Sequence, residues 1–366
     1  MPNSTLYIGL MSGTSMDGID CVLIDLARGR PDLLAQVLHP FDPALKSELM
    51  SLQSSSGSEL HRASLAANNL AMGYASAVRE VCRLANVHPR QVAAIGMHGQ
   101  TIRHRPELGY TLQIGNAALL AELSAITVVS DFRSRDIAAG GQGAPLVPAF
   151  HASLFASEQH RVILNIGGIA NVTDLPTSGQ IRGWDTGPGN LLMDGWISRH
   201  QGKSFDERGE WAAKGCVHKT LLDLLLKEAF FDAPPPKSTG RDLFHMRWLD
   251  EKLARCPAFS SADIQATLLE FTARSISASI EREARLAEEI YVCGGGAHNT
   301  RLMNRLTELN PLCSVGTTDA LGLHPDWVEA CAFAWLAHER LHNKPGNLPA
   351  VTGARGLRIL GAVHAA

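Results

Sequence analysis

The chain has 366 residues, of which 45% are hydrophobic and 19% charged, with a formal net charge of −3. That length exceeds one ordinary hydrophobic core and suits two packed domains. The near balance of 33 basic and 36 acidic residues, with no basic stretch, argues against a nucleic-acid or membrane-surface partner.

The first half is predicted to open with a β-hairpin. Residues 5–12 and 19–26 are apolar and flank a turn rich in glycine and hydroxyl side chains, which is typical of two paired strands. Helical segments are expected directly after the hairpin. The other elements expected in this half are helices at 58–85 and 116–124 and strands at 92–101, 110–115 and 126–132.

The pattern restarts near residue 155. Residues 161–175 again predict a strand, a glycine-containing turn and a strand, and both openings end in an aspartate, Asp25 or Asp174. Two similar openings of two similarly sized halves indicate a duplicated α/β unit. The elements expected next are a Pro-rich loop at 232–244, a helix near 264–287, a strand at 289–296 and a helix at 325–341.

Three glycine-rich loops raise the question of a phosphate site: "GLMSGTSMDG" (9–18), "NIGGIAN" (165–171) and "CGGGAHN" (293–299). Glycine lets the backbone approach a ligand closely, and N–H groups and hydroxyls donate to phosphate oxygens. The last loop follows a predicted strand and opens a helix, whose N-terminus favours anions. The first stretch alone fits an ordinary hairpin turn equally well, but three such loops favour a nucleotide.

Several motifs together carry a family resemblance: "GLMSGTSMDGID", "GMHGQTI", "QIGN", "SDFRSRDIAAGGQGAPLVP", "NIGGIAN" and "WDTGPGN". The order of two hairpins and a late glycine loop resembles the sugar kinase, Hsp70 and actin superfamily, whose two ribonuclease-H-like domains close on ATP. More narrowly, the motifs resemble the anhydro-N-acetylmuramic acid kinase family, over essentially the whole chain. The expected fold class is therefore α/β, with two ribonuclease-H-like (actin/hexokinase-like) domains around an ATP cleft.

The resemblance also implies how the chain is divided. Residues 1–155 would form an N-terminal domain with the sugar side and the first phosphate hairpin. Residues 156–366 would form a C-terminal domain with the second hairpin and the adenosine loop. This division leaves open whether the last helix packs on the first domain.

The activity implied by the resemblance is an ATP-dependent kinase reaction with Mg²⁺. It opens the 1,6-anhydro ring of 1,6-anhydro-N-acetylmuramic acid with water and phosphorylates O6, giving N-acetylmuramic acid 6-phosphate for peptidoglycan recycling. The partner is then a small anhydro sugar, and a homodimer is left open. A kinase for levoglucosan (1,6-anhydroglucose) shares fold and chemistry and stays the alternative.

The nucleotide is expected on residues of all three glycine loops. These are Gly13, Thr14, Ser15, Met16, Asp17, Gly18, Ile19, Asp20, Gly167, Gly168, Asn171, Gly294, Gly295 and Gly296. The first hairpin of the superfamily usually carries Asp-x-Gly, but "GLMSG" has no aspartate before Gly13. The magnesium ligand is therefore not transferable, and Asp17, Asp20 and Asp25 all stay open.

Asp185 lies in "GWDTGPGN" (183–190), where glycines and a proline are expected to hold a rigid loop. From the residues alone, an aspartate that caps a turn explains this position as well. The resemblance implies that Asp185 is the catalytic base, which deprotonates the water attacking C1 as in an inverting glycosidase. The phosphoryl group captures the leaving O6, so a second acid is not required.

The sugar is expected on donors and acceptors that suit its hydroxyls, its amide and its lactyl carboxylate. These are His98, Gln100, Thr101, Gln113, Arg133 and Glu329. Arg133 is the natural carboxylate partner. Each of three residues keeps an alternative role: His98 as a core histidine, Arg133 in a surface salt bridge, and Glu329 on a solvated helix face. Lys237 and Arg241 fit a phosphate contact or an exposed loop equally well.

Other classes of protein fit less well. "HERLH" (338–342) matches the H-E-x-x-H zinc pattern, but no Asp or Glu follows Glu339, so a zinc metalloprotease is a remote alternative. An Hsp70-like or actin-like module needs a further domain or filament surfaces, and a sugar-sensing repressor needs an N-terminal helix-turn-helix. Seven scattered cysteines without CxxC pairs, and no evident signal peptide, predict a cytoplasmic location.

Overall fold

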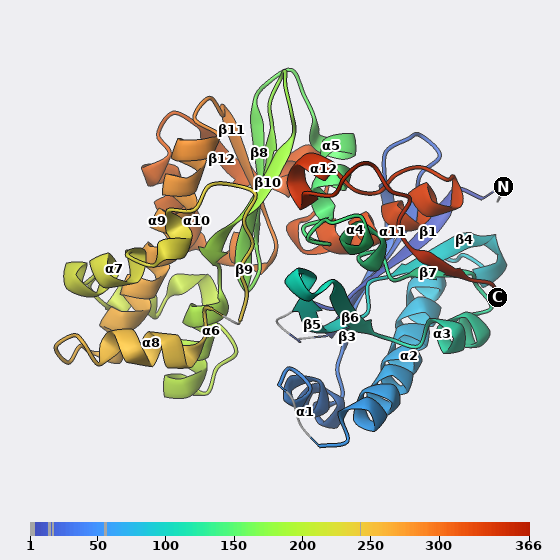
Figure 1. The fold of residues 1–366 in the computed structure, drawn as a ribbon, viewed down its shortest axis with the longest axis horizontal. Coiled ribbons are helices and arrows are strands. Elements are labelled where there is room, and N and C mark those ends of the chain that lie inside the picture. Colours follow the sequence, from blue (N-terminus) through green and yellow to red (C-terminus); the bar gives the residue numbers. More distant parts are fainter. Residues whose placement is uncertain (1–3, 14–15, 17, 55–56, 242) are drawn as a thin grey trace. The chain divides into compact units, whose positions relative to one another are not determined.

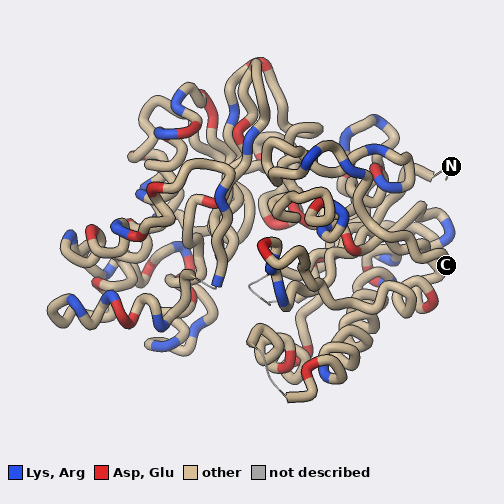
Figure 2. The backbone as a smooth tube through the Cα atoms, viewed as in Figure 1, with Lys and Arg blue, Asp and Glu red and all other residues tan. Residues whose placement is uncertain are grey.

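The computed structural model describes residues 4–13, 16, 18–54, 57–241 and 243–366 (Figure 1). The chain divides into two compact units, the first made of Met1–Leu154 with Trp327–Ala366 and the second of Phe155–Asp326. Each unit has its own β-sheet and its own hydrophobic core. Basic and acidic residues are interspersed over both units (Figure 2).

The first unit is built on a six-stranded sheet of order β13-β7-β4-β1-β2-β3. Its strands are β1 (Leu6–Met11), β2 (Gly18–Asp25), β3 (Asp32–Pro40), β4 (Val92–Met97), β7 (Val128–Ser130) and β13 (Ala362–His364), with a separate hairpin of β5 (Gln100–Arg105) and β6 (Tyr110–Ile114). Its helices are α1 (Pro43–Ser51), α2 (Glu59–Leu84), α3 (Ala117–Ser124), α4 (Ser134–Ala138), α5 (Val147–Phe155, whose last residue belongs to the second unit), α11 (Val328–Leu341) and α12 (Pro349–Thr352).

The second unit is built on a five-stranded sheet of order β10-β9-β8-β11-β12. Its strands are β8 (Arg161–Ile166), β9 (Ile169–Leu175), β10 (Arg182–Pro188), β11 (Glu289–Cys293) and β12 (Ser314–Thr317). Its helices are α6 (Leu191–Gln201), α7 (Lys219–Leu226), α8 (Met246–Leu253), α9 (Ser261–Glu283) and α10 (Thr300–Leu309). Within the described parts of the chain, no helix is long and apolar enough to cross a membrane.

The two sheets repeat one topology. In each unit the first three strands form an antiparallel meander, and the first strand also pairs in parallel with the fourth, beside which the fifth lies in parallel. This is the ribonuclease-H-like arrangement, present twice. The predicted fold class is confirmed, and so is the duplicated α/β unit inferred from the two similar openings.

Helix α11 lies on one face of the first sheet because two glycines let it approach. Gly9 of β1 and Gly96 of β4 are directly paired in the parallel ladder. A β-carbon at Gly9 would lie 2.8 Å from the Ala330 carbonyl carbon, and one at Gly96 would lie 2.6 Å from that of Phe333. Side chains of Ile8 and Leu10 face the opposite side, where α2 packs.

Gly96→Ala is expected to destabilise the first unit by about 1–3 kcal/mol, because the added methyl group meets helix backbone that cannot rotate away. For a unit of this size that corresponds to a melting temperature lower by roughly 2–10 °C. Thermal unfolding checks it against Gly57→Ala, where a β-carbon meets nothing within 4 Å. Equal melting temperatures for the two variants would contradict the close approach.

The prediction of helix directly after the first hairpin is wrong, because β3 occupies Asp32–Pro40. Its side chains alternate between exposed and partly buried, but both faces are apolar, with Leu34 and Leu38 exposed on the edge strand. The period of two is therefore hidden in the sequence. The expected strand 92–101 is divided in two at Gly99, which has a φ of +81°.

Candidate active site

Asp185 lies near the middle of β10, the edge strand of the second sheet. Its backbone N–H donates to the Lys237 carbonyl oxygen at 3.0 Å, and its Oδ2 accepts from the Thr239 N–H at 2.8 Å. Burial raises the pKa of Asp185 to about 7, whereas the Thr239 N–H and the charge of Lys237 act in the opposite direction. A carboxyl group that titrates near neutral pH is suited to take up a proton during turnover.

The expected rigid loop around Asp185 is wrong, because this segment is a strand. The strand is irregular there: its register with β9 shifts between Asp185 and Gly187, and Gly187 has a φ of +130°. Such bulges redirect side chains and are frequent beside active sites. Glycine and proline in "GWDTGPGN" indicate the irregularity correctly but conceal the strand.

A row of polar side chains crosses the second sheet from Asp185. Asn171 of β9 pairs directly with Asp185, and Asn165 of β8 pairs with Asn171, so the three share one face. Asn165 is buried, and a β-carbon on Gly294 would overlap its Oδ1. These polar side chains therefore extend from Asp185, the predicted base, to the glycine loop at 293–299.

The two glycine loops of the second unit meet at one edge of the sheet. The carbonyl oxygens of Gly167 and Gly168 accept from the N–H groups of Asn190 and Gly189, at 2.8 and 2.9 Å. A β-carbon on Gly296 would overlap the side chain of Ile166, directly before this turn. Because β8 and β11 are parallel, their carboxyl ends lie on the same side of the sheet. Ligands of α/β proteins bind at the carboxyl ends of the strands.

The glycines leave the backbone of these loops open to a nucleotide, because larger side chains at these positions would keep a ligand away from the backbone N–H groups. Gly295 begins a 3₁₀ helix, Gly295–His298, and α10 follows with Asn299 as its N-cap. The glycines therefore precede a helical turn, and α10 itself starts later than predicted.

The first hairpin is described in part: Thr14, Ser15 and Asp17 lie outside the described residues. Met16 adopts a φ of +55° and its N–H donates to the Gly13 carbonyl oxygen at 3.2 Å. Gly18 and Asp20 begin β2, and Asp20 is half-buried opposite Met11.

The metal ligands stay open. Asp25 pairs with Leu6 at the far end of β2, about 24 Å from the start of that strand at Gly18 at 3.4 Å per residue. It accepts a hydrogen bond from the Ala27 N–H there, so it does not face the glycine turn. In the parts of the chain that the structure describes, no group of three or more His, Cys, Asp or Glu side chains is placed to hold a metal ion.

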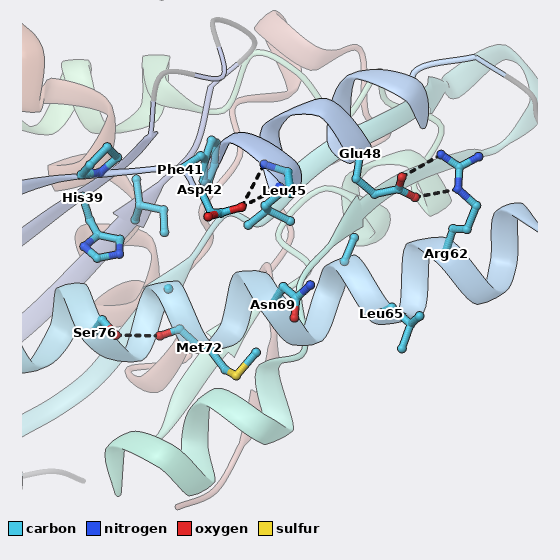
Figure 3. Close-up of a pocket in the computed structure, with 15 residues that line it drawn as sticks. His39, Phe41, Asp42, Leu45, Glu48, Arg62, Leu65, Asn69, Met72 and Ser76 are labelled. Carbon is cyan, nitrogen blue, oxygen red and sulfur yellow. Dashed lines mark hydrogen bonds and ion pairs between the residues drawn. The ribbon is translucent and has the colours of Figure 1, made fainter.

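Ile19 is placed differently from the rest of the first hairpin. Its side chain is buried in the core of the first unit and lines a groove of about 670 Å³ between α1, α2 and the end of β3. Figure 3 shows this groove, with the Glu48–Arg62 ion pair on one side and Met72 on the other. Only the backbone of Ile19 can therefore serve a nucleotide.

His98, Arg133 and Glu329 form one cluster in the first unit. The Arg133 Nε and Nη2 atoms lie 3.2 and 2.9 Å from His98 Nε2, and Nη1 donates to the Gly143 carbonyl oxygen at 2.8 Å. Arginine only donates, so His98 Nε2 must be unprotonated. Burial, followed by the nearby Arg133 charge, lowers the pKa of His98 to about 3.

Glu329 completes the cluster electrostatically. Burial raises the pKa of Glu329, and the charge of Arg133 opposes that shift. Burial lowers the pKa of Arg133 to about 10, and the charges of Glu329 and Asp136 oppose it. By accessible surface Glu329 and Arg133 are both half-buried, so their roles at the sugar stay a prediction.

Gln100, Thr101 and Gln113 lie on the paired strands β5 and β6. Gln113 Nε2 donates to Thr101 Oγ1 at 3.1 Å, so these two side chains partly satisfy each other. Gln100 is buried and its Nε2 donates to the Gly13 carbonyl oxygen at 3.3 Å. Gln100 therefore links the predicted sugar residues to the first glycine turn within one unit.

Four buried atoms in these regions have no hydrogen-bond partner among the described residues: His98 Nδ1, Gln100 Oε1, Asn165 Oδ1 and Thr239 Oγ1. Buried polar atoms are rarely left unpaired in folded proteins, so such atoms mark places where a ligand or water binds. Asn165, Asn190 and Thr239 were not predicted as site residues. Asn165 and Asn190 stand beside glycines in the quoted motifs, and Thr239 follows the Pro-rich run; these neighbours are their signal in the sequence.

Lys237 is half-buried in an irregular segment whose neighbours Pro236 and Ser238 are exposed. Its Nζ donates to the Phe230 and Phe231 carbonyl oxygens at 3.0 and 3.4 Å, within the 3₁₀ helix Ala229–Phe231. Arg241 is exposed and lies near enough to Asp194 for their charges to interact. No phosphate contact follows from either position.

Two ribonuclease-H-like units, each with a glycine-rich hairpin, define the fold of the ATP-using sugar kinase and actin class. The sequence model of "Anhydro-N-acetylmuramic acid kinase" matches residues 5–366. The chain belongs to the anhydro-N-acetylmuramic acid kinase family, and its substrate class is a small-molecule sugar.

Proteins of that name from three bacteria are similar over nearly their full length. The one from Thiobacillus denitrificans is 57% identical over 98% of this chain and 97% of its own. The relatives from Nitrosospira multiformis and Nitrosomonas europaea are 54% and 51% identical, each over 98% of this chain and 99% of their own.

Among solved structures, component A of (R)-2-hydroxyglutaryl-CoA dehydratase from Acidaminococcus fermentans is similar with a TM-score of 0.49. It is 14% identical, over 90% of this chain and 96% of its own. A ROK hexokinase from Thermus thermophilus has a TM-score of 0.39 and 14% identity, over 91% of this chain and 99% of its own.

Proposed function

We propose that this protein uses ATP to convert 1,6-anhydro-N-acetylmuramic acid into N-acetylmuramic acid 6-phosphate, a step of peptidoglycan recycling. The observation that carries the proposal is the place of Asp185 on the irregular strand β10. Its Oδ2 accepts from the Thr239 N–H at 2.8 Å, and it pairs with Asn171 in the polar row that leads to the glycine loops. Burial raises the pKa of Asp185 to about 7. A general base is most effective when it titrates near the working pH. Family membership then supplies the substrate on which such a base acts.

The proposed reaction joins water addition to phosphoryl transfer. Asp185 takes one proton from water while the water oxygen forms a bond to C1 of the sugar. The C1–O6 bond breaks, O6 bonds to the γ-phosphorus of ATP, and ADP leaves. Because O6 ends on phosphorus, one carboxylate is enough where an ordinary glycosidase needs two.

The two units have different proposed roles. In the second unit, Gly167, Gly168 and Gly294–Gly296 hold the nucleotide, with Asn171 between them and the base. In the first unit, the turn at Gly13 serves the phosphates. The proposed sugar residues there are His98, Gln100, Thr101, Gln113, Arg133 and Glu329.

Mg²⁺ is proposed to bind through the phosphate oxygens, one or two carboxylates and water, as it commonly does at nucleotides. It would neutralise charge on the transferring phosphoryl group. Asp20 is the described carboxylate at the first turn. A cytoplasmic location is supported by seven free cysteines. A homodimer stays a prediction.

Turnover in ¹⁸O-labelled water tests the reaction. We expect the label at C1 of the sugar product and none in the transferred phosphate, because water attacks carbon and phosphorus goes to O6. Mass spectrometry of the product and of inorganic phosphate distinguishes the two positions. Label in free phosphate with unchanged sugar would show simple ATP hydrolysis and contradict the proposal.

A further inference from the structure

Residues 237–239 hold the proposed base from two sides. The Lys237 carbonyl oxygen accepts from the Asp185 backbone N–H at 3.0 Å, and the Thr239 N–H donates to Asp185 Oδ2 at 2.8 Å. One contact fixes the main chain of the strand and the other fixes the carboxylate. This three-residue segment, here called the strap, therefore restricts both the position and the rotation of the side chain.

The strap is anchored by the side chain of Lys237. Its ammonium group donates to the carbonyl oxygens of Phe230 and Phe231 and lies 4.5 Å from the centre of the Phe230 ring. Arg282 of α9 donates to the same Phe231 carbonyl oxygen at 2.8 Å. The Phe231 ring packs under the bulge of β10, since a β-carbon at Gly187 would lie 2.8 Å from it.

We propose that the strap is a positioning element for Asp185, in which the Lys237 ammonium group both anchors the strap and favours the ionised carboxylate. This inference rests on the proposed function. Lys237 is then a positioning residue, because it acts on the base through the strap and its ammonium group is engaged by the Phe230 and Phe231 carbonyl oxygens. A lysine suits the position because it supplies a fixed charge and up to three hydrogen bonds.

The charges around the strap agree with this role. The Lys237 charge lowers the pKa of Asp185 against the larger effect of burial. The pKa of Lys237 is itself lowered, first by burial and then by Arg282, while Glu283, Asp232 and Asp185 oppose that shift. Removing the Lys237 charge should therefore move the Asp185 titration to higher pH.

Lys237→Met tests the inference through the pH profile of kcat, measured with the anhydro sugar and saturating ATP. We expect the acid limb, near pH 7 in the unaltered protein, to move up by about half a unit or more. At pH 7 kcat should fall by about twofold or more and recover toward pH 9, with the KM for ATP little changed. Lys237→Arg keeps the charge and should leave the limb within about 0.3 units, the resolution of such profiles.

Arg282→Met is the matched control. It releases the same Phe231 carbonyl oxygen from α9 but exerts no direct charge effect on Asp185, so the limb should stay in place. An unmoved limb in Lys237→Met would overturn the inference, as would a limb that moves equally in both methionine variants. A tenfold rise in the KM for ATP with an unmoved limb would assign Lys237 to phosphate binding. Absence of turnover by the unaltered protein would instead contradict the proposed function.

Discussion

Asp185→Asn is expected to lower kcat by about 10²–10⁴-fold, while ATP and sugar still bind. General-base catalysis commonly contributes that factor, equal to about 3–5 kcal/mol of the barrier. The amide oxygen of asparagine can still accept from the Thr239 N–H. The strap therefore keeps its contact, and the loss is one of proton uptake.

Steady-state kinetics and equilibrium binding measure the two parts of this result. Asp223→Asn serves as the control, because Asp223 forms a surface ion pair with Lys219 on α7 and should keep full activity. Retention of more than about a tenth of kcat would limit the lost stabilisation to about 1.4 kcal/mol. The base would then have to be another group.

The glycine-rich hairpins were predictable because their signal is local. A turn that needs glycine, with apolar strands on both sides, lies within one short stretch of sequence, Leu6–Asp25 for β1–β2 and Arg161–Leu175 for β8–β9. Strand β3 lacks such a signal, since its exposed face carries leucines that conceal the alternation.

The site was predictable in its residue types but not in its contacts. Thr239 reaches Asp185 from 54 residues away, and His98 meets Arg133 across 35 residues. Nothing in "GMHGQT" or "SDFR" indicates that the imidazole accepts the guanidinium hydrogen bonds. His98 was predicted to contact the sugar, whereas its Nε2 is engaged by Arg133, and its direct contact with a ligand stays a prediction.

That engagement determines how Arg133 can recognise a carboxylate. Its Nε edge faces His98 and one Nη1 hydrogen goes to the Gly143 carbonyl oxygen. One hydrogen on each of Nη1 and Nη2 is left for a ligand. With a pKa near 10 the group stays charged at neutral pH. A lactyl carboxylate in line with the guanidinium would thus gain a charge-assisted pair of hydrogen bonds.

Arg133→Ala is therefore expected to lower kcat/KM for 1,6-anhydro-N-acetylmuramic acid by about 10–100-fold, because charge-assisted hydrogen bonds contribute roughly 1.5–3 kcal/mol. Levoglucosan lacks the lactyl and N-acetyl groups, so its kcat/KM should hardly change. The unaltered protein should use levoglucosan at least about 100-fold less efficiently, since the smaller sugar leaves buried polar groups unpaired.

Measurements of kcat/KM on both sugars decide whether Arg133 recognises the lactyl carboxylate or has a role shared by both substrates. Arg133→Lys is the matched variant: it keeps the charge but loses the planar pair of donors, and should recover only part of the muramyl activity. Equal damage to both sugars in Arg133→Ala would place Arg133 in a shared or structural role. Comparable efficiency of the unaltered protein on both sugars would contradict the muramyl selectivity itself.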